Sequence, residues 1–318
     1  MSSRVWFVSD LHGSTVCFKK FLNSINTKKA PDVLIIGGDI TGKQIIPVVE
    51  SANYWKASLE GMTHKLPSIM DVEQFLSFLA DKGAYGYPCS ETELKQMQAN
   101  PAIWEEIAHS LIINRLYEWL DLADDRLKHW EGQLIINGGN DDPFFIDEIL
   151  RSTSLVIHPE GQVVEIAPDI EMISCGWSNP TPWQCPREVD DKELGRVLEK
   201  QVSKLRNPEL AVFNFHAPPF QTPLDIAPLL DAELRPVASG LGPEQVHVGS
   251  RSVRKIIEKY QPLVSLHGHV HEQHTFTSLG KTLCFNPGSE YYEGRLQGVF
   301  LEFDRGTLIH WGLTREGG

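Results

Sequence analysis

The 318-residue sequence has few cysteines, no excess of basic residues and no long apolar run. Its five cysteines include no C-x-x-C pair, which argues against a disulfide framework and a thiolate zinc site. Acidic residues outnumber basic ones by 42 to 29, whereas proteins that bind nucleic acid through its phosphates need a basic face. No run reaches the roughly 18–20 apolar residues of a membrane-spanning helix, and the N-terminus does not resemble a signal peptide. We therefore expect a cytoplasmic protein with no membrane contact, and the acidic composition argues against long nucleic acid as its partner.

Short apolar runs occur throughout the chain, at 4–9, 32–38, 133–139, 171–176, 210–215 and 262–268. Runs of this kind without alternation are typical of strands that are buried on both faces. Segments 15–27, 190–204 and 250–260 lie between them and repeat apolar residues at helical spacing. Alternation of strands and helices predicts an α/β layer fold. After residue 274, short strands joined by Gly and Asp turns predict an antiparallel sheet packed on the rest.

Residues 43–132 interrupt this alternation. The segments 71–83 and 90–130 have helical composition and period, and capping boxes are expected at Ser90–Glu93 and at Asp71–Gln74. We predict a mainly helical insertion at 43–132 within one domain that spans 1–318. Both ends of the insertion adjoin polar strand ends, so it is expected to cover the mouth of any site there.

Polar side chains follow five of the predicted strands. The groups are Asp10 with His12, Asp39 after two glycines, Asn140 with Asp141 and Asp142, His216, and the histidines of "LHGHVH" at 266–271. In open α/β sheets, functional groups gather at the carboxyl ends of the strands. Each group alone also fits a turn or a strand end, and His216 alone fits a core histidine. Occurring together, they predict a shared polar site.

The order D-x-H, G-D, G-N, H, G-H-x-H resembles the calcineurin-like metallophosphoesterase superfamily. The stretches "HAPP" (216–219), "LHGHVH" (266–271) and "NPGS" (286–289) resemble its cAMP-phosphodiesterase-related cytosolic branch. The likeness covers 4–42 and 133–303 but not the insertion. It implies a four-layer α/β/β/α sandwich and a dinuclear metal-dependent hydrolase of phosphate esters, with small phosphodiesters favoured and a metal-bridging hydroxide as the nucleophile.

The same resemblance implies a ligand set. One metal ion would be held by Asp10, His12, Asp39 and His271, and the other by Asp39, Asn140, His216 and His269. Asp39 would bridge, since a carboxylate can span two cations about 3.5–4 Å apart. Imidazole and carboxylate ligands without thiolate suit Mn, Fe or Zn.

The sequence departs from the family pattern after Asn140. Most relatives have a histidine next, which is taken to contact the scissile phosphate or to protonate the leaving group, and here Asp141 replaces it. We expect Asp141 to be ionised beside the metals, because their charge outweighs that of a phosphate. Asp39, Asn140, Asp141 and Asp142 are the residues implied in catalysis, with Asp142 orienting a neighbouring group. His267 is predicted to be structural, and His247 and Arg295 are candidates for substrate contacts.

Two other functions fit the same pattern. The first is a non-catalytic interaction module with this fold, for which eroded ligand positions are expected. All seven ligand positions are intact, which favours an enzyme. The second is a metal-dependent nuclease, against which the formal net charge of -13 argues.

Overall fold

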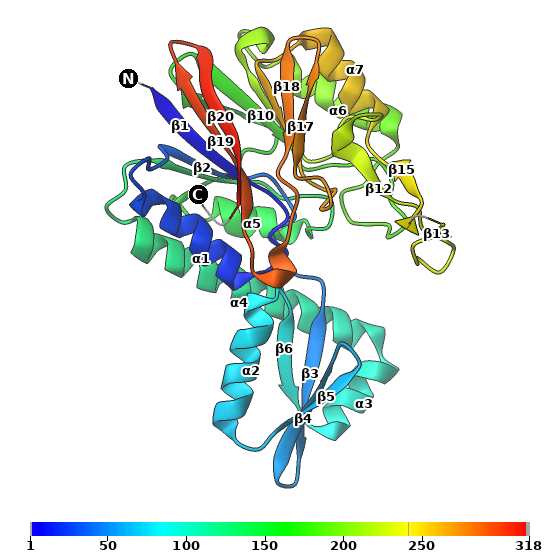
Figure 1. The fold of residues 1–318 in the computed structure, drawn as a ribbon. Helices are drawn as coiled ribbons and strands as arrows, with labels where there is room; N and C mark the ends of the chain where they lie inside the picture. The colour runs from blue at the N-terminus through cyan, green and yellow to red at the C-terminus, as the bar shows by residue number, and fades with distance from the viewer. Residues whose placement is uncertain (1, 241, 316–318) are drawn as a thin grey trace.

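The structure is a computed structural model that describes residues 2–240 and 242–315. Two six-stranded sheets form the body of the protein, and they lie next to each other (Figure 1). The first sheet has the order β20-β19-β1-β2-β7-β8. Its strands are β1 (Ser3–Val8), β2 (Val33–Ile36), β7 (Gln133–Ile136), β8 (Val156–Ile157), β19 (Gln297–Asp304) and β20 (Thr307–Arg315). The second has the order β17-β18-β16-β11-β10-β9. Its strands are β9 (Val163–Ala167), β10 (Ile170–Cys175), β11 (Val212–Phe215), β16 (Val264–Leu266), β17 (Thr275–Leu279) and β18 (Thr282–Asn286).

Each sheet has a run of parallel strands, and antiparallel strands flank it on one side in the first sheet and on both sides in the second. β1, β2, β7 and β8 run parallel, as do β10, β11, β16 and β18. The C-terminal strands pair antiparallel as predicted, β17 with β18 and β19 with β20. They do not form one separate sheet, however. β18 joins β16 in the second sheet, and β19 joins β1 in the first.

Helices cover the outer face of each sheet, which gives four layers. α1 (Thr15–Asn23), α4 (Pro101–Leu127) and α5 (Phe145–Arg151) pack on the first sheet, and α6 (Asp191–Val202) and α7 (Arg251–Tyr260) pack on the second. The apolar run of β1 is continuous because both faces of this strand are buried. Val5 and Phe7 face the other sheet, while Trp6 and Val8 face the helices. The predicted α/β/β/α sandwich is therefore confirmed.

The segment after β2 forms a lobe that projects from the body (Figure 1). It contains β3 (Ile45–Ser51), β4 (Tyr54–Leu59), β5 (Met62–Leu66), α2 (Ile69–Asp81), β6 (Tyr85–Cys89) and α3 (Glu91–Ala99). Its strands form a sheet of order β5-β4-β3-β6, which the prediction of a mainly helical insertion missed. Pro47 in β3 and the polar faces of β4 and β5 hid these strands, because neither resembles a buried strand.

The helices of the insertion agree better with the sequence. A capping box begins α3, where Ser90 and Glu93 bond reciprocally, as predicted. The box of α2 is formed by Ser68 and Asp71, so the prediction that it starts at Asp71 was wrong by three residues. A serine precedes this helix, and a serine hydroxyl caps an amide as well as an aspartate does.

The second half of α4 packs in the main core and not only in the lobe. Its buried residues Ile112, Leu116, Trp119, Ala123 and Leu127 belong to the same cluster as the apolar face of α1. Helix α4 therefore connects the lobe to the body.

Two short antiparallel ribbons between β11 and α7 complete the fold. They pair β12 (Ile226–Pro228) with β15 (Gln245–His247), and β13 (Ala238–Ser239) with β14 (Gly242–Pro243). Within the ranges given above, none of the helices has the length and apolarity that crossing a bilayer would take.

Replacement of Trp119 by alanine is expected to lower the free energy of unfolding by about 3–5 kcal/mol, as for other buried aromatic truncations. The Trp119 ring stacks on Phe18 with ring centroids 4.2 Å apart, and its N–H donates to Thr15 Oγ1 at 3.1 Å. Tyr117 on the same helix is half exposed, so Tyr117→Ala should change stability by less than about 0.5 kcal/mol. Urea unfolding compares the two variants, and equal losses would contradict this account of α4.

Candidate metal centre

The loops after β1 and β2 are locked together and hold three of the expected ligands. The amide of Asp10 donates to Gly38 O at 3.0 Å, and the amide of His12 donates to Asp39 O at 2.9 Å. Asp10, His12 and Asp39 all have positive φ, at 59°, 42° and 49°, and His269 has 70°. Such backbone costs about 1–3 kcal/mol per residue and clusters at functional sites. The strain lies at ligand positions and is held by these hydrogen bonds.

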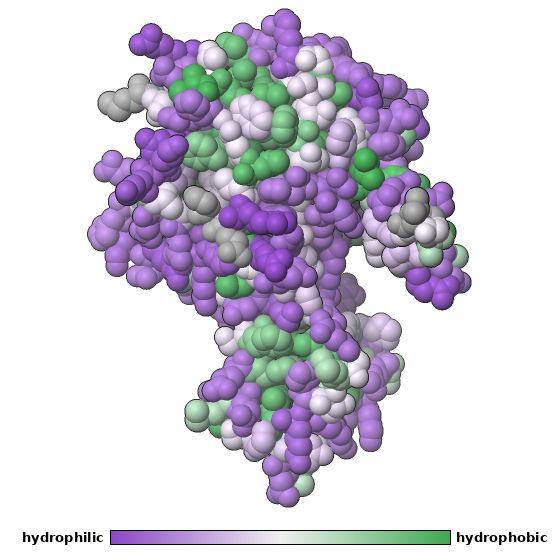
Figure 2. Space-filling model, in the orientation of Figure 1, coloured by the Kyte–Doolittle hydropathy of each residue, from purple (hydrophilic) through white to green (hydrophobic). Residues whose placement is uncertain are grey.

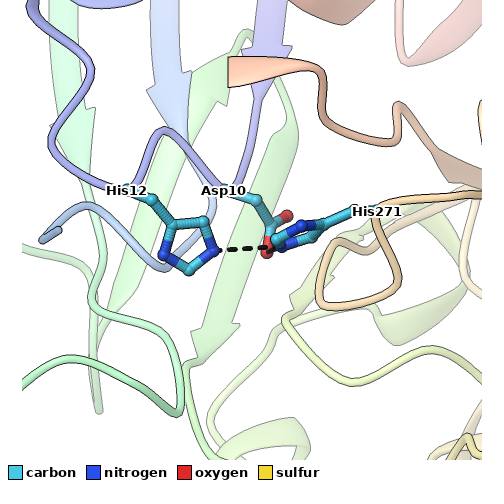
Figure 3. Close-up of side chains that lie close together, drawn as sticks. All are labelled: Asp10, His12 and His271. Carbon is cyan, nitrogen blue, oxygen red and sulfur yellow. Dashed lines mark hydrogen bonds and ion pairs between the residues drawn. The ribbon is translucent and has the colours of Figure 1, made fainter. Parts of the chain in front are cut away.

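Asp10, His12 and His271 form the first cluster (Figure 3). His12 Nε2 lies 3.0 Å from His271 Nε2, and His271 Nε2 lies 3.4 Å from Asp10 Oδ1. The backbone amide of His269 donates to both carboxylate oxygens of Asp10, at 3.0 and 3.1 Å. Two imidazole nitrogens and a carboxylate thus face one small volume.

Asp39, His216 and His269 form the second cluster. His216 Nε2 lies 3.3 Å from Asp39 Oδ2, and His269 Nδ1 lies 2.8 Å from Asn140 Oδ1. Asp39 Oδ2 is also 3.7 Å from His12 Nε2 in the first cluster. All seven residues of the predicted ligand set therefore come together, and Asp39 lies between the two clusters.

Several buried nitrogens of these clusters have no hydrogen-bond partner among the described residues. They are both ring nitrogens of His216, of which Nε2 only approaches Asp39 Oδ2 at 3.3 Å, and His12 Nδ1, which is the ring nitrogen other than the one that faces the first cluster. A buried polar atom without a partner is costly, so each such atom needs an explanation, for which an ion is one candidate. Imidazole, carboxylate and amide donors together suit Mn, Fe or Zn. The residues present thus fit a pair of metal ions.

Burial and neighbouring carboxylates set the protonation states of the ligands. Although burial opposes it, Asp39 raises the pKa of His216 to about 9, and Asp10 raises the pKa of His271, so both would lose a proton when a metal ion binds. Burial lowers the pKa of both His12 and His269 to about 3, so both are neutral at pH 7, the form that binds metal. Burial opposes ionisation of Asp10, but hydrogen bonding to His271 and the nearby imidazoles hold the pKa of Asp10 well below its usual range. Burial raises the pKa of Asp39 to about 7, a shift that a bound cation would reverse.

The glycines before Asp39 and Asn140 leave room for the ligands. A Cβ on Gly38, whose φ is 147°, would lie 2.4 Å from His216 Nδ1. A Cβ on Gly139 would lie 2.2 Å from Asp39 Oδ1. Side chains at these two positions would displace the ligands, so the Gly-Gly pairs belong to the site.

Asp142 is fully buried and ties two ligand loops together. Its carboxylate accepts from the amides of Ile40, Thr41 and Gly139 at 3.0, 2.9 and 2.8 Å, and from Thr41 Oγ1 at 2.7 Å. These contacts fix the loop that carries Asp39 against the loop that carries Asn140.

The "NPGS" stretch supports the histidine loop, a role that sequence reasoning did not assign. Asn286 Nδ2 donates to Gly268 O and Val270 O at 3.1 and 3.0 Å, and Ser289 Oγ donates to Asp10 O at 2.7 Å. The buried His267 places Nδ1 2.8 Å from Phe215 O, outside both clusters, which agrees with a structural role.

Asp141 adjoins both clusters, because it forms a third group with His12 and Asp39 whose possible ligand atoms lie within 4.8 Å of one another. Its amide donates to Asp39 Oδ1 at 3.0 Å, Cys185 Sγ donates to its Oδ1 at 2.6 Å, and its Oδ2 forms an ion pair with the Lys43 ammonium. Burial would raise the pKa of Asp141, but Lys43 holds it well below its usual range, so Asp141 is ionised as expected. Sequence reasoning missed both Lys43 and Cys185. The available signal was a lysine four residues after Asp39 in a loop.

The two candidate substrate residues are engaged elsewhere. His247 Nδ1 lies 2.8 Å from Asp225 Oδ1, and Arg295 Nη1 lies 3.3 Å from Glu290 Oε2. Neither residue is a member of the clusters described above.

Residues 3–273 match the family model of the calcineurin-like phosphoesterases. The chain belongs to this family. An uncharacterized protein of Methanocaldococcus jannaschii, MJ1162, is 32% identical over 161 residues, which cover 50% of this chain and 65% of that protein. The match thus spans less than two thirds of the relative's length.

Two solved structures were compared with this chain. One crystal structure is 18% identical, covers 99% of both chains and superposes with a TM-score of 0.57, which supports the fold alone. The crystal structure of TT1561 of Thermus thermophilus is 13% identical and has a TM-score of 0.48 over 98% of this chain and 99% of its own. Family membership supports metal-dependent hydrolysis of phosphate esters.

Proposed function

We propose that this protein is a dinuclear metal-dependent hydrolase of small phosphodiesters. The observation that carries the proposal is that the ends of five strands bring imidazole and carboxylate groups together in two adjoining clusters, in each of which the possible ligand atoms lie within 4.8 Å of one another. One ion would be held by Asp10, His12, Asp39 and His271. The other would be held by Asp39, Asn140, His216 and His269.

The proposed mechanism assigns a role to the metal ions and to several residues of the chain. Metal ions held by these residues would activate a water as nucleophile and would offset the charge of the phosphate oxygens. Asp142 and the positive-φ backbone fix the ligands, which pre-organises the site. Asp141 is ionised and cannot readily donate a proton, so we expect hydrolysis to depend on a good leaving group. Preference for diesters rests on the resemblance, and preference for small substrates rests on the net charge of -13.

The test is reconstitution with Mn, Fe or Zn and assay against aryl mono- and diesters and single-stranded nucleic acid. We expect about two equivalents of metal, with the activated diester hydrolysed fastest. His271→Ala should lose metal and activity, whereas the exposed His310→Ala should keep both. Metal binding without turnover of any ester would instead support an interaction module, and preferential cleavage of nucleic acid would support a nuclease.

One observation favours the interaction module as the second candidate. Met62, Ile69 and Met70 are more than half exposed on the lobe, at 59%, 61% and 64%. Figure 2 shows apolar surface on the lobe, below the mostly polar waist that joins it to the body. Isolated exposed apolar residues are common, so this observation ranks behind the intact ligand set.

A cytoplasmic location is also part of the proposal. All five cysteines are free thiols, and four of them are buried. Free thiols are typical of proteins in a reducing compartment.

A further inference from the structure

Lys43 lies at the root of the lobe, on the loop between β2 and β3. The residues before it are fixed to the site. Thr41 Oγ1 donates to Asp142 at 2.7 Å, and the amide of Gly42 donates to the Tyr85 hydroxyl at 3.0 Å. The backbone that carries Lys43 is therefore held beside the metal clusters, although the lobe as a whole points away from them (Figure 1).

The Lys43 ammonium lies next to the metal clusters because it contacts Asp141. It forms an ion pair with Asp141 Oδ2, and ligand atoms of Asp141, Asp39 and His12 lie within 4.8 Å of one another. Since the other oxygen of Asp141 accepts from Cys185, both oxygens of this carboxylate have partners. The repulsion that an unpaired Asp141 would exert on a phosphate is thus offset by a cation in contact with it.

The ammonium keeps donors for a ligand. Lysine has three N–H donors, and the carboxylate of Asp141 needs one of them. The Lys43 side chain is 54% exposed, so its remaining donors are open to an incoming molecule. An anion that reached His12 and Asp39 would therefore come close to a cation with free donors.

We propose that Lys43 binds an oxygen of the substrate phosphate and thereby supplies a positive charge that belongs to the protein itself. The inference rests on the proposed function, because it takes the two clusters as the place where phosphate binds. It assigns Lys43 a contact with the substrate in addition to its ion pair. The charged hydrogen bond would strengthen binding of the free phosphate product as well as of the ester.

The test compares Lys43→Met, Lys43→Arg and the wild-type protein, all loaded with Mn. Lys56→Met is the matched control, since Lys56 also lies in the lobe and pairs with a carboxylate, Glu91, at 3.1 Å. Calorimetric binding of inorganic phosphate is the first readout, metal content by elemental analysis is the second, and kcat and KM for an activated aryl diester are the third.

We expect Lys43→Met to keep both metals and to bind phosphate roughly tenfold more weakly, which is the low end for a charged hydrogen bond because Lys43 is half exposed. Lys43→Arg should recover most of the affinity, and Lys56→Met should match the wild type. Phosphate affinity within twofold of the wild type in metal-loaded Lys43→Met would overturn the inference, and so would loss of metal by that variant.

Failure of the inference is distinguishable from failure of the proposed function. A wild-type protein that hydrolyses no ester but binds phosphate through Lys43 would refute only the function. A wild-type protein that hydrolyses the diester, with no change on Lys43→Met, would refute only the inference.

Discussion

Asp39→Ala is expected to release both metal ions and to lower kcat/KM for an activated diester by roughly 10³-fold or more, since several kcal/mol of charge stabilisation depend on the metals. Asp39 Oδ2 lies 3.3 Å from His216 Nε2 in one cluster and 3.7 Å from His12 Nε2 in the other. Removal of this carboxylate therefore takes a ligand from both proposed metal sites.

Single histidine variants should behave differently. His271→Ala and His269→Ala each remove a ligand from one cluster only, so each should weaken mainly one metal equivalent. Asp125→Ala is the matched control for lost charge, because Asp125 is exposed on α4. Elemental analysis after dialysis gives the stoichiometry of each variant. Two tightly bound ions in Asp39→Ala would rule out the bridging role.

The position of the site was predictable because it depends on a property of parallel strands. Each buried run is short and ends in polar residues, and the carboxyl ends of such strands meet at one edge. Asp10 and His216 are far apart in the sequence, yet their side-chain atoms lie 3.9 Å apart. The burial of both faces of β1 was also predictable, because the residues from Val5 to Val8 are all apolar and do not alternate with polar ones.

Contacts between distant loops were not predictable in the same way. Cys185 meets Asp141 across 44 residues, and Lys43 meets Asp141 from the start of the insertion. No periodicity or spacing encodes such a contact, since it depends on how the loops cross above the sheets. The partners of β18 and β19 were hidden for the same reason, because local pattern identifies a strand and not its neighbour.

The sheet of the lobe was missed for a different reason. Its core is small and consists of residues from β3, β4 and β5 together with α2 and Ala84. Strands such as β5 are mostly exposed, so hydrophobic alternation is weak. The two-residue turn at Glu60 and Gly61, both with positive φ, was the signal that a hairpin joins β4 and β5.

Arg187→Met is expected to destabilise the protein by about 3–5 kcal/mol, the usual loss when one partner of a buried ion pair is removed. The Arg187 side chain is 1% exposed and donates to both oxygens of Asp147, at 2.7 and 3.1 Å. It also donates to the carbonyls of Asp142 and Pro143, at 2.9 and 3.0 Å. The substitution would leave Asp147 poorly compensated and would release the loop that carries Asn140.

The effect of Arg187→Met should depend on pH in a defined direction. Although burial opposes it, hydrogen bonds from His158 and Arg187 hold the pKa of Asp147 at about 2, against 3.8 for an ordinary aspartate. A lowered folded-state pKa stabilises the protein above the unfolded-state value, and this contribution is lost as pH falls toward 2. The difference in unfolding free energy between wild type and Arg187→Met should therefore be largest above about pH 4 and should decrease in acid.

Arg196→Met provides the control, because the ion pair of Arg196 with Glu193 on α6 is exposed and should contribute at most about 1 kcal/mol. Urea unfolding of the three metal-free proteins from pH 7 to pH 3 measures these differences, and a gap that stays constant across this range would contradict the role given to the Arg187–Asp147 pair.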